Sequence, residues 1–172
     1  RGQSWTLEYD PVGQPASLSA PDGTAVTMAY DSARRLVAVS EPAGRVTRFQ
    51  VDGSGRLTAR VEPDGTRTEV QRDAAGRVVT VVEAAGSPRA RITRLARGEG
   101  GLVQTMTLAA GTPRQTVWTF SYDKAGLLVA FENARGARWD WERDALGRVR
   151  RIVDPVAGET TVAYDAASRP VR

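Results

Sequence analysis

Aspartate recurs along this chain at a fixed period, and this period constrains the fold more than any other feature. The step is 21 residues within two groups, and a gap of 50 residues, equal to two steps of 25, separates the groups. The members are Asp10, Asp31, Asp52 and Asp73, followed by Asp123, Asp144 and Asp165. A fixed period of roughly 20 to 50 residues indicates one supersecondary unit copied along the chain. The sequence therefore predicts a repeat array.

Each repeat contains a second turn, which is marked by glycine. In most repeats this glycine lies eight residues after the apolar residue that closes the first turn, as in Leu36 to Gly44 and Leu57 to Gly65. The second-turn glycines are Gly23, Gly44, Gly65, Gly86, Gly111 and Gly136. Two turns in each repeat leave strands of roughly 6–8 residues, a common strand length.

We expect residues 1–172 to form a single array of about seven repeats and a partial eighth. The period is 21, and two longer repeats span about 74–123, where a degenerate repeat has Gly98 in place of the turn aspartate. The last residues, 164–172, begin a repeat and stop inside it, so we expect the chain to be a piece of a longer array.

Residues before each turn alternate in polarity, which is typical of a β-strand. The third residue before the turn is apolar, the fourth is polar, and the fifth is β-branched or aromatic, as in Trp118, Thr119 and Phe120. This period of two gives one apolar and one polar face. We predict an all-β fold of tandem antiparallel hairpins in a curled, meandering sheet. A single layer cannot cover its own apolar face, so the sheet must close with other units, curl or dimerise.

The turn residues suit tight hairpins. An aspartate that starts a turn can accept hydrogen bonds from amides two residues on, and glycine adopts the positive φ that closes the turn. In the first turn of the second repeat, Arg34 replaces glycine. We expect that turn to be strained or to belong to another type.

These motifs resemble the YD repeat of the RHS family, whose pattern is roughly Tyr-Asp-x-x-Gly-Arg-Leu followed later by Pro-Asp-Gly. Close copies occur at residues 30–36, at 52–57 with 62–65, and at 143–149. The tyrosine is replaced by Val51, Arg72 and Arg143. The resemblance extends over essentially the whole chain.

The resemblance implies a structural role. RHS repeats form part of a larger hollow shell, which in secreted bacterial toxins encloses a toxin domain that is not in this chain. The implied partners are flanking repeats of the same parent chain and the enclosed toxin domain, and exposed edge strands could allow self-association. The implied location is secreted or at the bacterial cell surface. The alternative is a cell-surface adhesion module that binds a glycan or a protein partner.

Family shells also carry a self-cleaving aspartyl site that begins Asp-Pro-x-Gly. Asp10-Pro11-Val12-Gly13 has those four residues, but it lies at an ordinary repeat turn and lacks the rest of the motif. Asp154-Pro155 belongs to a longer second turn. We assign neither segment a catalytic role.

Composition excludes several kinds of catalysis. The chain has no histidine and no cysteine, so Ser-His triads, thiol nucleophiles and His/Cys zinc sites cannot form. We predict no enzyme activity, no cofactor and no metal. A third hypothesis, a glycoside hydrolase, would use Asp140 and Glu142 as acid and base, but these lie on the polar face of a single sheet, where no cleft is expected.

The net charge of +4 comes from arginines spread over turns and polar strand positions next to acidic residues. This pattern is typical of a solvated, ion-paired surface and argues against nucleic-acid binding, which needs basic residues gathered on one face. No apolar run approaches the ~20 residues of a transmembrane segment.

Tryptophans give the one candidate ligand site. Trp118 and Trp139 occupy equivalent positions in successive repeats, and Trp141 lies two residues further on the same face. They could form a platform for sugar rings. Alternatively they fill the core beneath the sheet, which their match in phase with Met28 and Phe49 favours.

Overall fold

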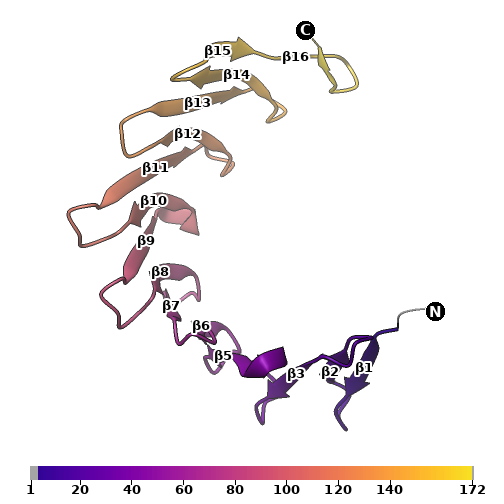
Figure 1. Cartoon of the computed structure of the whole chain (residues 1–172). Coiled ribbons are helices and arrows are strands. Elements are labelled where there is room, and N and C mark those ends of the chain that lie inside the picture. The colour runs from indigo at the N-terminus through magenta and orange to yellow at the C-terminus, as the bar shows by residue number, and fades with distance from the viewer. Residues whose placement is uncertain (1–3, 172) are drawn as a thin grey trace. The chain divides into compact units, whose positions relative to one another are not determined.

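The computed structural model describes residues 4–171, and its regular structure is almost entirely β-strand (Figure 1). The chain divides into two compact units, Arg1–Arg91 and Ile92–Arg172. The first unit contains β1 (Thr6–Tyr9), β2 (Pro15–Ser19), β3 (Ala25–Tyr30), β4 (Leu36–Glu41), β5 (Arg45–Val51), β6 (Leu57–Val61), β7 (Arg67–Arg72) and β8 (Val78–Glu83). A 3₁₀ turn, η1 (Pro42–Gly44), lies between β4 and β5.

The second unit continues with β9 (Arg91–Arg97), β10 (Val103–Leu108), β11 (Thr116–Tyr122), β12 (Leu128–Glu132), β13 (Arg138–Arg143), β14 (Val149–Asp154) and β15 (Gly158–Thr161). A second 3₁₀ turn, η2 (Glu99–Gly101), joins β9 to β10. The last strands, β16 (Ala163–Tyr164) and β17 (Pro170–Val171), form a separate hairpin. No helix in residues 4–171 has the length and apolar character needed to cross a membrane.

Each strand pairs antiparallel with the next strand along the chain, from β1 to β8 in the first unit and from β9 to β15 in the second. This arrangement confirms the predicted all-β fold of tandem antiparallel hairpins in a meandering sheet. Most strands have 4–7 residues, slightly fewer than expected. The difference arises because the turn aspartates and the residues beside them leave the strand ladder.

A register shift occurs at the end of the first hairpin of six repeats, next to the residue that directly precedes the turn aspartate. The shifts lie at Glu8/Tyr9, Ala29/Tyr30, Gln50/Val51, Gln71/Arg72, Ser121/Tyr122 and Glu142/Arg143. A bulge of this kind increases the local twist and redirects a side chain. The side chain of the residue before the aspartate therefore no longer follows the alternation of side-chain directions along the strand.

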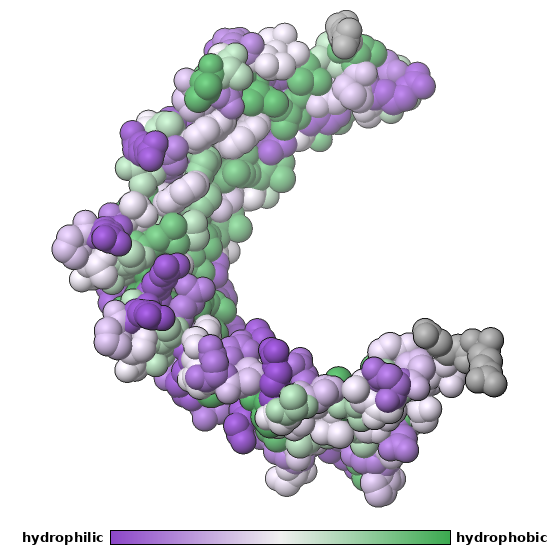
Figure 2. Space-filling model, in the orientation of Figure 1, coloured by the Kyte–Doolittle hydropathy of each residue, from purple (hydrophilic) through white to green (hydrophobic). Residues whose placement is uncertain are grey.

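Apolar residues face one another across the strands on one side of each unit. The facing pairs are Leu7 and Leu18, Met28 and Val39, Val70 and Val81, Leu95 and Met106, Phe120 and Phe131, and Trp141 and Ile152. Arg60 interrupts this row by standing opposite Phe49. Figure 2 shows hydrophobic residues gathered over the strands of the second unit.

The apolar row is not covered by a second layer within the described chain. Only Ala59, Ala110 and Ala130 are buried among residues 4–171, and the side chains of the row are half-buried or exposed. Leu7, at the N-terminal end of the row, is 45% exposed. Cross-strand pairs and turn contacts therefore carry most of the cohesion of each unit.

Ala59 lies on the opposite, polar face, beneath a group of long polar side chains. Its neighbours in register are Gln50 and Glu69, and Arg67 bonds to both of them, at 2.9 Å to the Gln50 amide oxygen and 2.7 Å to the Glu69 carboxylate. The bridge crosses β6 close to Ala59, which is 1% exposed. A small residue is required there because the bridge leaves no room for a longer one.

We predict that Ala59→Leu lowers the free energy of unfolding by about 1–3 kcal/mol, because the larger side chain must displace the Arg67 bridge. Urea unfolding followed by circular dichroism measures the effect. Ala75→Leu is the matched control, since Ala75 is exposed at a turn position that holds leucine in another repeat, at Leu146. Equal stability of the two variants would contradict the prediction.

Candidate functional site

The first turn of each repeat is built around the aspartate carboxylate. At Asp52, Oδ1 accepts hydrogen bonds from the amides of Ser54 and Arg56, at 2.9 and 3.0 Å. The backbone closes the same turn, since the Gly55 amide donates to the Asp52 carbonyl at 2.9 Å. Oδ1 accepts the amide four residues on in the same way in the other turns, at Asp10, Asp31, Asp73, Asp123, Asp144 and Asp165. One side chain therefore satisfies amides that the hairpin leaves unpaired.

An arginine four residues after the aspartate holds the second carboxylate oxygen in five of these turns. The Nε to Oδ2 distance is 2.7–2.8 Å, and the arginines are Arg35, Arg56, Arg77, Arg148 and Arg169. The carboxylate thus binds backbone through one oxygen and guanidinium through the other. Gln14 and Leu127 stand at the equivalent positions of two further turns, which lack this ion pair.

The hydrogen bonds stabilise the charged carboxylate. They lower the pKa of Asp31, Asp52, Asp73 and Asp165 below the ordinary 3.8, chiefly through the amide four residues on. For Asp144 the first cause of the lowered pKa is the hydrogen bond from the Arg148 side chain.

The residue four positions after the aspartate also contacts the next first turn in its unit. Gln14 Nε2 donates to the Arg34 carbonyl at 2.9 Å, and Arg35 Nη1 donates to the Asp52 carbonyl at 2.7 Å. Arg148 Nη1 lies 3.0 Å from the Ser168 hydroxyl. The contact is apolar where leucine stands there, as Leu127 lies against Gly147. Each turn is therefore linked to its neighbour along this edge of the sheet.

The residue directly before the turn aspartate makes a second link, and we call it the clip residue. The hydroxyls of Tyr30, Tyr122 and Tyr164 donate to the carbonyls of Pro15, Val103 and Val149, at 2.9, 3.0 and 2.7 Å. Each acceptor lies at or near the first residue of the strand that follows the previous turn. The bulge beside the clip residue directs its side chain across the sheet to this carbonyl.

Arginine replaces tyrosine as the clip residue without loss of the link. Arg72 Nη2 donates to the Leu57 carbonyl at 3.3 Å, and Arg143 Nη2 donates to the Leu128 carbonyl at 3.2 Å. Both acceptors lie 15 residues earlier, the same separation as for Tyr30 and Tyr164. Sequence analysis treated these arginines only as departures from the tyrosine pattern. The signal that could have identified them is their position directly before the turn aspartate, which tyrosine holds in other repeats.

Arg34 adopts a φ of 63°, in the left-handed region, where most of its equivalents are glycines and Ser168 is the other exception, with a φ of 61°. The turn keeps the standard bonds, since the Arg34 amide donates to the Asp31 carbonyl at 2.9 Å. The turn type is therefore unchanged, and the arginine carries backbone strain. This agrees with the first of the two expectations for this turn.

All six predicted second-turn glycines have positive φ, between 73° and 85°. Gly23, Gly65 and Gly136 close short turns in which the glycine amide donates to the carbonyl three residues earlier. In the longer turns Gly86 and Gly111 follow Ala84 and Ala109, which also have positive φ, at 50° and 51°. Gly44 ends the 3₁₀ turn η1.

Sequence analysis missed a side-chain lock in these second turns. Asn133 Oδ1 accepts the amides of Arg135 and Ala137 at 2.9 and 3.1 Å, as the aspartates do in the first turns. The aspartate period does not predict this lock, because here an asparagine at a second turn provides it.

The aromatic residues of the second unit stack on one another. Phe131 lies between Trp118 and Trp139, with ring centroids 5.0 and 5.2 Å away and ring planes inclined by 33° and 30°. These spacings are close to the ~4.8 Å between adjacent strands, so rings on neighbouring strands pack against one another in a tilted arrangement. Trp139 Nε1 also donates to Asp154 Oδ2 at 2.8 Å. Packing against Phe131 thus covers part of the ring surface of Trp118 and Trp139.

Trp141 lies further along the same strand and faces a shallow groove of about 520 Å³. Leu127 and Val129 contribute apolar walls, and Arg143 and Arg150 lie on the rim. All three candidate tryptophans are half-buried.

The carboxylates considered for hydrolysis are both paired with arginine. Asp140 binds Arg138 at 2.9 Å, and Glu142 binds Arg151 and Arg150 at 2.6 and 2.8 Å. The hydrogen bond from Arg151 lowers the pKa of Glu142. A general acid needs a raised pKa, so Glu142 does not have the electrostatics of the acid in a glycosidase site.

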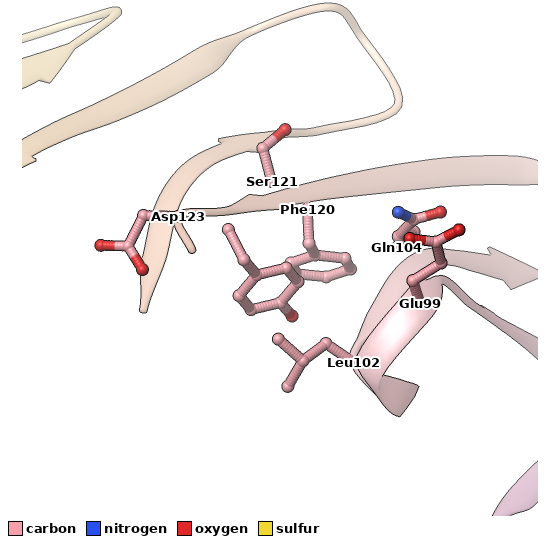
Figure 3. Close-up of a pocket in the computed structure, with 7 residues that line it drawn as sticks. Glu99, Leu102, Gln104, Phe120, Ser121 and Asp123 are labelled. Atoms are coloured by element: carbon pink, nitrogen blue, oxygen red, sulfur yellow. The ribbon is translucent and has the colours of Figure 1, made fainter. Parts of the chain in front are cut away.

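A second small pocket, of about 290 Å³, lies beside η2 and β11 in the same unit. Figure 3 shows Phe120 and Leu102 facing this space, with Glu99 and Gln104 at its other end. It is below the usual size of ligand sites and brings no acid and base together. Within residues 4–171, no group of three acidic, histidine or cysteine side chains is placed to hold a metal ion.

Comparison with known proteins connects this geometry to a family. A model of the RHS repeat matches residues 9–46, 51–88 and 122–156. No curated protein matches the chain.

Solved structures share the fold over nearly the whole chain. The Tc holotoxin pore of Photorhabdus luminescens, with a mutated TccC3, is 13% identical with a TM-score of 0.78, over 97% of this chain and 10% of that one. TcdB2-TccC3-Cdc42 is 17% identical with a TM-score of 0.62, over 97% of this chain and 11% of that one. TcdB2-TccC3 is 15% identical with a TM-score of 0.60, over 99% of this chain and 12% of that one. The chain spans about a tenth of the length of these chains.

We predict that Arg34→Gly stabilises the protein by about 0.5–1 kcal/mol, because glycine relieves the left-handed strain at some cost in unfolded-state entropy. The link from Gln14 is kept, since it uses the backbone carbonyl of residue 34. Thermal unfolding measures the gain. Ala33→Gly, in the same turn but without positive φ, should give none. A loss of stability in Arg34→Gly would refute the interpretation.

We also predict an acid-induced loss of stability that originates in the turns. A carboxyl whose folded pKa is depressed contributes stability that is fully present above its unfolded pKa, near 3.8, and is lost as pH falls through the lower folded pKa. The melting temperature should therefore stay nearly constant from about pH 7 to 5 and fall below about pH 4.

The triple variant Asp31→Asn, Asp52→Asn, Asp73→Asn tests the origin of this loss. Asparagine keeps the amide bonds, as Asn133 does, but does not titrate. Its melting temperature should be lower near neutral pH and depend less on pH below 4 than that of the parent protein. An unchanged acid slope would show that other groups are responsible.

Proposed function

Because the chain belongs to the RHS repeat family, we propose that it is a section of the wall of a hollow β-shell in a larger bacterial toxin. In this proposal the shell encloses a toxin domain that lies outside this chain, and flanking repeats continue the wall on either side. The parent protein is secreted or displayed at the cell surface. The role of this section is structural.

The uncovered apolar row is the observation that carries the proposal. Hydrophobic residues follow one face across successive strands, yet only three alanines are buried in residues 4–171. Exposed apolar area is costly in water, at roughly 25 cal/mol per Å². A closed wall removes that area by turning the row toward an interior, where further repeats or a cargo cover it.

The turn links support the same role. They hold successive hairpins in register through side chain to backbone bonds, without a core beneath the sheet. A wall one sheet thick needs this form of cohesion, because a second layer would fill the space it encloses. The likeness to Tc holotoxin and TcdB2-TccC3 structures further supports a toxin-shell assignment.

The packing of the aromatic residues makes the adhesion module the weaker alternative. Trp118 and Trp139 pack against Phe131, which reduces the aromatic surface open to a sugar. The arginine pairing of Asp140 and Glu142 likewise favours a surface role over hydrolysis.

The native polypeptide from the source organism tests the proposal. Its mass, measured under denaturing conditions, should be several times 18.5 kDa, and electron cryomicroscopy should show a hollow particle with this array in its wall. Density inside the particle should come from residues C-terminal to the array. A native product near 18.5 kDa, or a large protein without an internal cavity, would overturn the proposal and favour an adhesion or scaffold role.

A further inference from the structure

We call the contact region between two successive first turns of a unit a joint. The joints differ in the side-chain hydrogen bonds that link the two turns. Within residues 4–91 and 92–171 there are six joints, named by their turn positions: 10–31, 31–52, 52–73, 98–123, 123–144 and 144–165. In five of them the clip residue donates to a carbonyl of the preceding repeat. The exception is joint 31–52, where the clip residue is Val51.

Valine cannot make the link because its side chain has no donor. Val51 occupies the same place beside the bulge as the other clip residues, since the register shifts between Gln50 and Val51. Its counterpart acceptor, 15 residues earlier, is Leu36, at the start of β4. The geometry of the joint is thus preserved and the donor alone is missing.

Arg35 supplies a polar link at this joint. Its Nε binds the carboxylate of its own turn, at 2.7 Å from Asp31 Oδ2, and its Nη1 donates to the Asp52 carbonyl of the next turn, also at 2.7 Å. The side chain lies close to Gly55, since a Cβ there would be 3.6 Å from Arg35 Cδ. One guanidinium therefore joins both turns.

Arg56 occupies the equivalent position in the next turn and gives a natural comparison. It binds Asp52 Oδ2 at 2.8 Å through Nε, and its side chain is 44% exposed against 33% for Arg35. Its joint, 52–73, has a second link from the clip residue Arg72 to the Leu57 carbonyl. Loss of Arg56 leaves that link in place, whereas loss of Arg35 leaves joint 31–52 without its guanidinium bridge and without a clip.

We propose that joint 31–52 is the point at which the first unit opens locally, and that Arg35 is the positioning residue that keeps it closed. Val51 makes the joint dependent on this one side chain. The consequence is a point of local weakness in the sheet of the first unit, which depends on Arg35 and Val51 and can be changed without changing the stability of the whole fold. The inference does not depend on the proposed function.

Hydrogen exchange of the full native polypeptide, read by mass spectrometry, tests this directly. In Arg35→Ala, amides of β4 and of the turn at Asp52 should exchange about fivefold to tenfold faster, as expected for loss of a charge-assisted hydrogen bond. In Arg56→Ala, amides of β6 and of the turn at Asp73 should change by less than about twofold, because the Arg72 link persists. Equal local effects in the two variants would overturn the proposal, as would a uniform rise over all peptides.

Val51→Tyr provides the rescue. A tyrosine there can donate to the Leu36 carbonyl as Tyr30 donates to Pro15, across the same separation of 15 residues. It should slow exchange at joint 31–52 in the parent protein and restore near-parent exchange when combined with Arg35→Ala. Val51→Phe is the matched control, with the ring but without the hydroxyl, and should do neither. Failure of Val51→Tyr to slow exchange, or equal slowing by Val51→Phe, would show that the missing donor is not the cause.

Discussion

The carboxylate of the turn aspartate is the contact on which the rest of each repeat depends. Through one oxygen it holds the amides of the turn, and in most repeats its second oxygen orients an arginine guanidinium. That orientation carries Nη1 of Arg35 to the following turn. A local hydrogen bond is in this way converted into a contact between repeats. Without the anchored carboxylate, a long exposed arginine would lose too much side-chain entropy to hold such a bridge.

A sheet that lacks a core must obtain cohesion from its edges and from its cross-strand neighbours. Here the apolar row provides pairwise contacts on one face, and the polar face is bound by ion pairs such as Arg67 with Glu69. Exposed ion pairs contribute little individually. Their value increases where a bridge crosses a third strand, as Arg67 does by bonding to Gln50 over β6. The polar face therefore joins β5 and β7, which are not neighbours in sequence, whereas the apolar row joins adjacent strands.

Much of the fold was predictable because the repeat is regular. The aspartate period placed the first turns, alternation placed the apolar face, and glycine placed the second turns. Alternation did not predict the clips. Tyr30 and Arg72 look unrelated in chemistry, and only the bulge beside each one shows that both side chains cross to a backbone carbonyl. The packing of Trp118 on Phe131 also could not be predicted from the sequence, because strand register decides which aromatic residues come close to each other.

The clip acceptor is a main-chain carbonyl, and this has a consequence for how such a chain can lengthen. Every residue type provides a carbonyl, so the acceptor survives any substitution that leaves the strand in place. The donor and acceptor also belong to one stretch of about twenty residues, as Tyr164 and Val149 do. A duplicated segment therefore brings both halves of its own joint and fits the preceding repeat without any matching change there. The array can therefore lengthen by duplication without a coordinated mutation elsewhere. A copy that loses its donor, as at Val51, stays in register, and its joint can then acquire a different link.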